Sequence, residues 1–308
     1  TDLYIDEARM FDLVSSIPVY YDEPFADSSQ IATMLVSELA RKRVTVALSG
    51  DGGDEFFCGY NVYDKVHQAQ QLDWLGEMAH GICNIPGVCS LKLEEKLPFS
   101  VRAIAGNRPK ETKTQFAYNK YEPIARRMVQ GEQLSCFYPV ESSYDVKNWQ
   151  IRRMLLDMDT YLPGDILCKV DRASMKYSLE ARCPILDKEV MEYSFRIPHE
   201  MKYQQGIKKK ILKDIAYDYL PKELLERPKT GFAVPMDQWL HGPLKEQLLS
   251  YSDNTFLKKQ GIFDPEYTSM RVAQYLGTRD AGPSTGANYS KLMWAFFVFQ
   301  QWFETYRR

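Results

Sequence analysis

Residues 44–60 of the chain read VTVALSGDGGDEFFCGY, and this stretch decides the fold. Residues 44–48 are apolar or β-branched, with no polar alternation apart from Thr45. Such a run is typical of a strand that is covered on both faces, as in a parallel sheet. It leads into a glycine-rich turn and then a helical stretch, and open α/β sheets bind their ligands at such turns. We therefore expect a ligand site at residues 49–55.

The glycines of this turn favour a phosphate ligand. Backbone N–H groups freed by Gly50, Gly52 and Gly53 could hold an anion at the start of the helix, and Ser49 can add a hydroxyl. The turn contains neither the GxxxxGK[ST] nor the GxGxxG pattern, so it is not one of the common phosphate-binding loops.

The acids of the same turn point to a cation. Asp51, Asp54 and Glu55 would together repel a bare phosphate, and this conflict disappears if a divalent cation lies between them. Mg²⁺ is commonly held by one or two carboxylates together with substrate phosphates. The turn therefore predicts a magnesium–nucleotide or magnesium–pyrophosphate site. The alternative is a plain glycine turn whose acids favour the positive end of the helix dipole.

The composition is that of an ordinary soluble protein. The 308 residues are 44% hydrophobic and 26% charged, and the formal net charge of −2 gives no electrostatic reason to expect nucleic acid or an anionic membrane as a partner. No segment approaches the ~18 uncharged apolar residues of a membrane span. The six cysteines form no zinc pattern, and the first residues are polar and acidic. We expect a reduced chain in the cytoplasm.

The chain changes character near residue 60. The order of strand, helix, strand, glycine turn and helix before that point is an α/β pattern, and strand candidates are rare after it. We expect a single domain over residues 1–308. Within it, residues 1–60 would form the remainder of a nucleotide-binding α/β part, and residues 61–308 a mainly helical part that completes the site.

Several further segments carry clear signals. Asp27 is a candidate N-cap for the helix after it, with Gln30 three residues later as in a capping box. Residues 147–180 predict a helix that is broken at a Leu-Pro-Gly sequence, and residues 207–220 predict an amphipathic helix. Residues 292–306 are rich in aromatic side chains and predict a core helix, with a homodimer contact as the alternative.

Some charged residues have two interpretations each. The lysines at 208–210 form either a solvated helix face or a phosphate patch, and we favour the solvated face. Arg182 could reach a phosphate or pair with a nearby acid, and we favour the pair. Asp187 is expected to cap the helix that follows it.

The turn and three other stretches together resemble the glutamine-hydrolysing asparagine synthase family. SGDGGDEFFCGYNVY at 49–63 is very similar to the signature of that family. The segment leading into it from residue 21, YLPGDILCKVDRASMKYSLEARCPILD at 161–187 and LPKELLERPKTGFAVPMDQWL at 220–240 agree in the same order. The resemblance extends to about residue 245 and is weaker in 75–145.

The resemblance implies an ATP-pyrophosphatase fold, which is a Rossmann-type parallel sheet with many helices, here truncated and mostly helical. It implies ATP-dependent amidation of a carboxylate through an acyl-adenylate, with ATP and Mg²⁺ as cofactors. The first hypothesis is conversion of aspartate to asparagine with ammonia from glutamine in the full-length protein. A relative that acts on a sugar, polysaccharide or secondary-metabolite carboxylate stays open, as does a catalytically silent module that binds a nucleotide or a partner.

The resemblance also implies roles for particular residues. Ser49 and Gly50 would contact the AMP part of ATP, with Gly52 and Gly53 completing the cofactor-binding turn, and Asp54 would be a Mg²⁺ ligand.

Three residues would carry the chemistry. Asp51 lies where the family has an acid linked to forming the adenylate, although the best-known members carry Glu there. It could take a proton from ammonia or hold Mg²⁺, and the sequence does not separate these roles. Lys229 would stabilise the developing charge during adenylation and amidation, and Asp165 would lie at the substrate pocket.

Two parts of the family pattern are absent from the 308 residues. The pyrophosphate loop of the form SGGxDS does not occur, and the first residue is Thr rather than the cysteine nucleophile of a glutaminase domain. We therefore expect that the isolated chain cannot carry out glutamine-dependent amidation alone.

Overall fold

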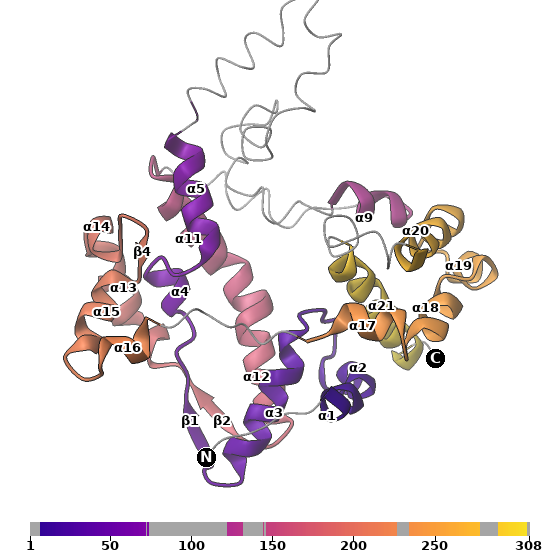
Figure 1. The fold of residues 1–308 in the computed structure, drawn as a ribbon, viewed down its shortest axis with the longest axis horizontal. Helices are drawn as coiled ribbons and strands as arrows, with labels where there is room; N and C mark the ends of the chain where they lie inside the picture. The colour runs from indigo at the N-terminus through magenta and orange to yellow at the C-terminus, as the bar shows by residue number, and fades with distance from the viewer. Residues whose placement is uncertain are drawn as a thin grey trace, which may run out of the picture.

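A computed structural model of the chain describes residues 7–71, 73, 122–131, 144, 146–226, 234–277 and 289–306. Most of these residues are helical, and the strands are short (Figure 1). The elements up to residue 131 are α1 (Glu7–Asp12), η1 (Val14–Ser16), α2 (Ile17–Tyr20), α3 (Ser29–Arg41), β1 (Val46–Leu48), α4 (Gly53–Phe56), α5 (Asn61–Gln71) and α9 (Glu122–Met128). The elements from 146 to 208 are α11 (Trp149–Asp159), η4 (Leu162–Leu167), α12 (Cys168–Met175), β2 (Glu180–Arg182), η5 (Pro184–Leu186), α13 (Lys188–Arg196), α14 (His199–Lys202), β3 (Tyr203–Gln204) and β4 (Ile207–Lys208). The remaining elements are α15 (Lys210–Tyr217), α16 (Lys222–Leu225), α17 (Met236–His241), α18 (Lys245–Tyr251), α19 (Asn254–Gln260), α20 (Pro265–Gly277) and α21 (Ser290–Tyr306).

The predicted strand before the glycine turn is present and lies in a parallel sheet. β1 pairs with β2 in parallel, with Ala47 opposite Ala181, and the N–H of Ser49 continues the ladder by donating to the carbonyl of Arg182 at 2.8 Å. The expected cover on both faces is wrong for the described residues, because Leu48 is 74% exposed. Within the described parts of the chain the sheet consists of these two strands alone, so β1 is not an interior strand there.

Helices α3 and α12 pack against each other at the centre of the molecule (Figure 1). The apolar stripe of α3 is buried as its spacing predicts, with Ile31, Met34 and Leu35 in the main core. The predicted break in the long helix is confirmed, since α11 ends at Asp159 and a π-helix, η4, precedes α12. Pro163 lies at the start of η4, and a proline interrupts the regular hydrogen bonding of an α-helix.

Helices α13 to α16 lie on one side of this centre, next to α4 (Figure 1). A second core forms here around Phe56, Phe57 and the π-helix η4. The predicted helix over 207–220 begins later than expected, because residues 207 and 208 form strand β4 in a hairpin with β3. Gly206 turns this hairpin at a φ of +83°, a left-handed conformation that glycine adopts without a steric penalty.

Helices α17 to α21 and α9 lie on the other side (Figure 1). The aromatic segment is helix α21, and Trp294, Phe296 and Phe297 are buried in the main core, so the predicted core role is confirmed. The homodimer contact stays a prediction.

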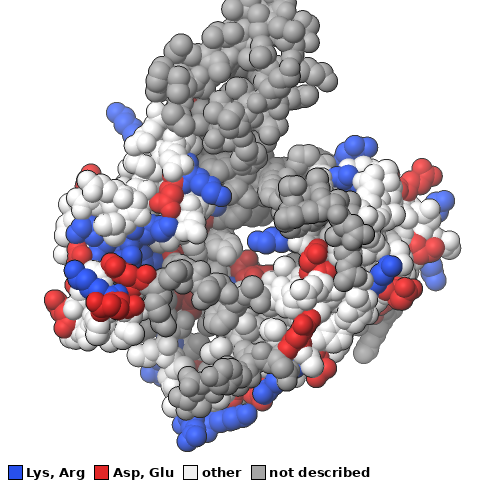
Figure 2. Space-filling model, viewed as in Figure 1, with Lys and Arg blue, Asp and Glu red and all other residues white. Residues whose placement is uncertain are grey.

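Charged side chains of both signs are mixed on the surface. Figure 2 shows basic and acidic side chains interspersed over the α13 to α16 region rather than separated into a patch of one sign. Among the described residues, no helix is both long and apolar enough to cross a membrane.

Candidate functional site

The glycine turn joins the carboxyl end of β1 to the start of α4. Gly52 is the residue before α4 and has a φ of +88°, which is the left-handed region. A Cβ atom at this position would lie 2.4 Å from Cδ2 of Leu186, so both the backbone and the neighbouring residue require glycine. The turn is closed by a hydrogen bond of 3.3 Å from the N–H of Gly53 to the carbonyl of Gly50.

Asp51 is held by neutral donors. The hydroxyl of Ser49 donates to Oδ2 of Asp51, and Sγ of Cys183 lies 3.9 Å from the same oxygen. Burial, and then the nearby Asp51 carboxylate, raise the pKa of the Cys183 thiol, so the thiol stays protonated and able to donate. The turn therefore presents a carboxylate whose described contacts leave its negative charge uncompensated.

Asp54 is compensated by a lysine that the sequence did not reveal. Nζ of Lys209 lies 3.0 Å from Oδ2 of Asp54, and each side chain is 25% exposed. Gly59 makes the contact possible, since a Cβ atom there would lie 2.0 Å from Oδ1 of Asp54 and 2.2 Å from Cε of Lys209. Lys209 has a φ of +52°, and its N–H donates to the carbonyl of Phe57 at 3.2 Å. A non-glycine residue in this region is uncommon and often marks a constrained site.

The expected solvated face at 208–210 is therefore wrong. Lys208 bonds to Asp64 at 2.8 Å and Lys209 bonds to Asp54, while Lys210 pairs with Asp214 one turn along α15 at 2.6 Å. The hairpin β3–β4 directs the first two lysines toward α5 and the glycine turn, because these residues precede the helix instead of lying on its outer face.

Glu55, the third acid of the turn, is turned away from the ligand side. It is 1% exposed, and the hydroxyl of Tyr60 donates to its Oε1 at 2.6 Å. Burial raises the pKa of this carboxyl group. The expectation that three acids face one ligand is thus wrong for Glu55, and Asp51 and Asp54 remain.

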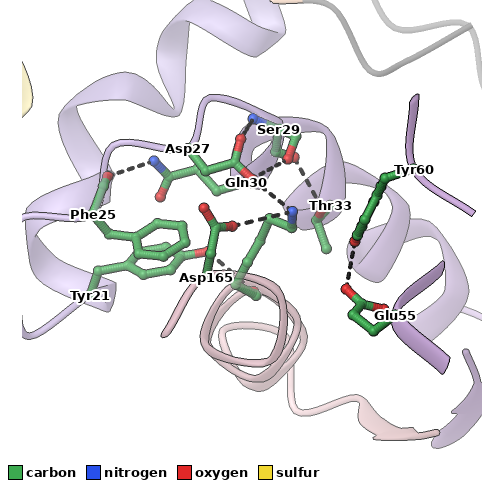
Figure 3. A network of polar contacts seen from close by, with 10 residues as sticks. Tyr21, Phe25, Asp27, Ser29, Gln30, Thr33, Glu55, Tyr60 and Asp165 are labelled. Atoms are coloured by element: carbon green, nitrogen blue, oxygen red, sulfur yellow. Dashed lines mark hydrogen bonds and ion pairs between the residues drawn. The ribbon is translucent and has the colours of Figure 1, made fainter. Parts of the chain in front are cut away.

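Asp165 lies in a separate polar cluster, on the π-helix η4. Figure 3 shows the side chains of Asp165 and Asp27 pointing toward each other beside the stacked rings of Tyr21 and Phe25. Nζ of Lys169 lies 2.7 Å from Oδ2 of Asp27 and 3.8 Å from Oδ1 of Asp165, so the closer ion pair of Lys169 is with Asp27.

The two carboxyl groups of this cluster titrate differently. Burial, and then the charge of Asp27, raise the pKa of Asp165 to about 7. Burial acts in the same sense on Asp27, but the ion pair with Lys169 and the hydrogen bonds from Ser29 outweigh it and lower its pKa. Oδ1 of Asp27 also accepts the N–H of Ser29 at 3.0 Å. The predicted N-cap at Asp27 is nevertheless wrong by one position, because Ser28 precedes α3, and Gln30 bonds to the carbonyl of Phe25 instead of completing a capping box.

Tyr161 stands between the two clusters. Its ring meets that of Tyr60 edge-on at 5.8 Å, and it lines the same pocket as Asp165. The structure thus brings the 49–54 residues together on one turn and holds Asp165 on a neighbouring element. Lys229 lies outside the described residues.

The Arg182 and Asp187 predictions are confirmed. Arg182 pairs with Glu180 at 2.6 Å, and the side chain of Asp187 accepts from the N–H of Glu189 at the start of α13.

The described residues fit a magnesium ion only as part of a nucleotide complex. Among them, no three His, Cys, Asp or Glu side chains come together as a metal site. Asp54 offers one carboxylate at the turn, and Mg²⁺ is often held by one or two carboxylates plus substrate phosphates.

A glycine-rich turn at the carboxyl end of a parallel strand and the start of a helix defines a class, the α/β proteins that bind phosphate-bearing ligands at this position. The family model described as asparagine synthase matches residues 1–304. The chain therefore belongs to the asparagine synthase family.

Individual relatives agree with this assignment. The chain is 28% identical over 293 residues to asparagine synthetase [glutamine-hydrolyzing] 1 of Bacillus subtilis (strain 168). The matched region covers 92% of this chain and 44% of that protein. It is 30% identical over 297 residues to a putative asparagine synthetase [glutamine-hydrolyzing] of Mycobacterium tuberculosis (strain ATCC 25618 / H37Rv). That match covers 92% of this chain and 43% of the relative. It is also 20% identical over 301 residues to amidase chry2 of Gibberella zeae, a match that covers 86% of this chain and 43% of the relative. The chain thus spans less than half the length of these relatives.

Proposed function

We propose that this chain is the ATP-using part of a ligase that converts a carboxylate to an amide. The acceptor carboxylate oxygen attacks the α-phosphorus of ATP and pyrophosphate leaves, which gives an acyl-adenylate. Ammonia then attacks the acyl carbon, AMP leaves with the carboxyl oxygen, and the new amide nitrogen loses a proton. The observation that carries the proposal is the turn between β1 and α4, held open at Gly52 in a chain of the asparagine synthase family.

The turn would hold the nucleotide. Ser49, Gly50, Gly52 and Gly53 would contact the phosphates through the hydroxyl and backbone N–H groups at the start of a helix. Asp54 would hold a Mg²⁺ ion that arrives with ATP, and this ion would supply charge screening for the phosphates.

Lys209 adds a cation beside the turn. Its ammonium bonds to Asp54, so a phosphate group bound beside this carboxylate would lie next to the positive charge of Lys209. Preorganised cations next to a transferring phosphoryl group contribute to catalysis because they need no rearrangement when charge develops.

Three further residues would act on the acceptor and the ammonia. Asp51 would lie beside the adenylated carboxylate and accept the proton of the incoming nitrogen, and Lys229 would stabilise developing charge. Asp165 would belong to the acceptor pocket. The upstream part of the full-length protein would supply a pyrophosphate loop of the form SGGxDS and ammonia from glutamine.

Aspartate is the first candidate for the acceptor, since two of the relatives are named as asparagine synthetases. A second candidate is a carboxylate other than aspartate, because a relative of similar coverage is named an amidase instead.

The test measures AMP formation from ATP by the natural protein that contains these 308 residues, with ammonium chloride and either aspartate, succinate or glucuronate. We expect one of these carboxylates to increase AMP formation at least tenfold. If no carboxylate in a wider series increases AMP formation in this way, the proposed reaction is wrong.

Two lysine variants test the turn itself. Lys209→Met is expected to lower AMP formation at least tenfold, whereas Lys210→Met is the matched control, since Lys210 pairs with Asp214 along α15. Lys209→Arg should retain part of the activity, and circular dichroism checks that each variant is folded. Equal effects of the two Met variants would remove Lys209 from the site.

A further inference from the structure

A pocket of about 350 Å³ is distinct from both the glycine turn and the Asp165 cluster. It is enclosed by α1 with η1, by the start of α18 and by the C-terminal half of α21, and these helices lie on the same side of the molecule (Figure 1). Its volume is at the lower end of the range of small-molecule sites, which is about 300–1,000 Å³. Because its described lining contains no residue of the turn or the cluster, it is a separate candidate site.

Three of the lining residues are apolar and firmly packed. Val14 is 2% exposed and Leu244 is 6% exposed. The ring of Phe11 meets that of Trp239 edge-on, with the ring centroids 5.5 Å apart. Such walls favour a ligand with an apolar part, because binding it removes apolar surface from water.

Helix α21 contributes a polar residue to the pocket from its buried face. Trp294, Phe297 and Gln301 follow one another at helical spacing, and each is at most 9% exposed. Oε1 of Gln301 is buried and accepts no hydrogen bond within the described residues. The neighbouring Gln300 differs, since its amide exchanges two hydrogen bonds with Gln260, at 2.7 and 3.2 Å. Buried polar atoms nearly always have a partner, so Gln301 has an acceptor that a ligand can satisfy.

A second amide oxygen in the lining is that of Gln247. Nε2 of Gln247 donates to the hydroxyl of Tyr251 at 2.8 Å, and this hydroxyl donates to Oε2 of Glu304 at 2.7 Å. The donor end of the Gln247 amide is therefore engaged, while its oxygen accepts no hydrogen bond from the described residues.

The third acceptor in the lining is the carboxylate of Asp12. It has no ion-pair partner within the described parts of the chain, and it lies at the C-terminal end of α1, which is the negative end of the helix dipole. The basic residue in the same turn, Arg9, pairs with Glu38 at 2.7 Å. The hydroxyl of Ser15, which also lines the pocket, donates to the backbone carbonyl of Asp12 at 3.4 Å. The pocket thus offers acceptors and a negative charge.

We propose that this pocket binds a primary amine that has a short apolar chain and no carboxylate. An ammonium group carries three donors, which match the carboxylate of Asp12 and the amide oxygens of Gln247 and Gln301. The chain packs against the apolar lining residues. Amino acids are excluded, because no basic side chain among the described residues lines the pocket to receive a carboxylate.

The ligand is an effector rather than a substrate. It contacts α1, α18 and α21 at once, so its binding stabilises the packing of the first described helix on the last ones. The described lining includes no part of the glycine turn, and the inference does not depend on the proposed function.

Calorimetry without ATP, on the natural protein that contains these 308 residues, tests the proposal with matched probes. Pentylamine is compared with 1-pentanol and norleucine, and benzylamine with benzyl alcohol and phenylglycine, with ammonium chloride as a further probe. We expect at least one amine to bind about tenfold more tightly than its alcohol, its amino acid and ammonium, since hydrogen bonds between charged groups are the stronger ones. If neither amine exceeds its alcohol, or if ammonium binds as tightly as the amines, the proposal is wrong.

Substitution of the carboxylate locates the ammonium group. Asp12→Asn keeps the shape of the side chain and removes its charge, so it should abolish the preference for the amine over the alcohol. Asp171→Asn, which changes an exposed aspartate on α12, is the matched control and should leave that preference unchanged. A preference that survives Asp12→Asn in a folded variant would overturn the assignment.

Two glutamine variants separate a binding role from a structural one. Gln301→Leu should weaken amine binding about fivefold, yet it should not lower the midpoint of thermal unfolding, because it removes a buried acceptor without a described partner. Gln300→Leu should lower that midpoint and leave amine binding unchanged, since it removes the hydrogen-bond partner of Gln260. Unchanged amine binding in Gln301→Leu would remove this residue from the site and contradict the proposal.

The outcome is separable from that of the proposed function. Carboxylate-dependent AMP formation, together with no preference for amines in the calorimetry, would refute this pocket assignment and leave the ligase intact. An amine preference that depends on Asp12, together with no AMP formation from any carboxylate, would support the pocket and refute the ligase.

Discussion

Replacing Gly52 with alanine should destabilise the protein, whereas the same change at Gly50 should not. The φ of +88° at Gly52 would cost an alanine about 1–2 kcal/mol, and a Cβ atom at 2.4 Å from Leu186 adds an overpacking cost of about 1–3 kcal/mol. The loss of unfolded-state entropy offsets about 0.4–1 kcal/mol, which leaves a net destabilisation of about 1–5 kcal/mol. Gly50 has no positive φ, and a Cβ atom added there would meet no other atom within 4 Å, so only the small stabilising effect remains.

Thermal unfolding followed by circular dichroism measures the difference. An unfolding entropy of about 2.1 cal/mol/K per residue gives a shift of roughly 1.5 °C per kcal/mol for a chain of 308 residues. Gly52→Ala should therefore lower the midpoint by roughly 2–8 °C, and Gly50→Ala should leave it unchanged or slightly higher. A double-mutant cycle with Leu186→Ala then separates the two costs. Shortening Leu186 should recover the overpacking part and leave the backbone part.

Two results would refute this reasoning. Equal losses at Gly50 and Gly52 would mean that the turn conformation does not depend on the left-handed residue. If the stability losses of Gly52→Ala and Leu186→Ala were simply additive in the double variant, the turn would not pack against η5 as described.

Two other predictions concern buried charge. Arg153→Met should destabilise the protein by about 3–5 kcal/mol, because it removes the cation from an ion pair that is 3% and 1% exposed. Arg196→Met should cost less than about 1 kcal/mol, since that pair is 75% and 47% exposed. Urea unfolding measures both, and equal losses would contradict the burial argument. The pKa of Asp165 is raised from 3.8 to about 7, so the folded state gains stability from this group below about pH 4 and loses it as the pH rises through 7. Asp165→Asn cannot ionise, so its stability relative to wild type should increase from pH 4 to pH 8 in thermal unfolding, while Asp171→Asn should show no such trend.

The local parts of the fold could be predicted from the sequence. The strand before the glycine turn, the break at Pro163 and the cap at Asp187 each follow from residues within a few positions of one another. Such signals depend on backbone geometry and short-range hydrogen bonds, which leave a pattern in the sequence itself.

The orientation of charged side chains could not be predicted in the same way. Glu55 belongs to the turn by sequence, but it is directed into the core because Tyr60 donates to it there. Lys209 looked like a helix-surface residue, and only the hairpin before it and the absence of a side chain at Gly59 bring it to Asp54. A glycine following an expected phosphate turn was the one signal in the sequence, and it does not identify the lysine that uses the space.

The pairing of acids and lysines also separates the four aspartates of the two clusters into two kinds. Asp54 and Asp27 each bond to a lysine from a distant part of the chain, at 3.0 Å to Lys209 and 2.7 Å to Lys169. Among their described contacts, Asp51 receives neutral donors, and Asp165 has its nearest ammonium at 3.8 Å. A carboxylate without a lysine partner attracts a cation more strongly than one with such a partner, and more so in a partly buried site. This difference supports the proposal that Asp51 and Asp165 act on the substrate and the ammonia, whereas Mg²⁺ would reach Asp54 only together with the phosphates of ATP, next to the ammonium of Lys209.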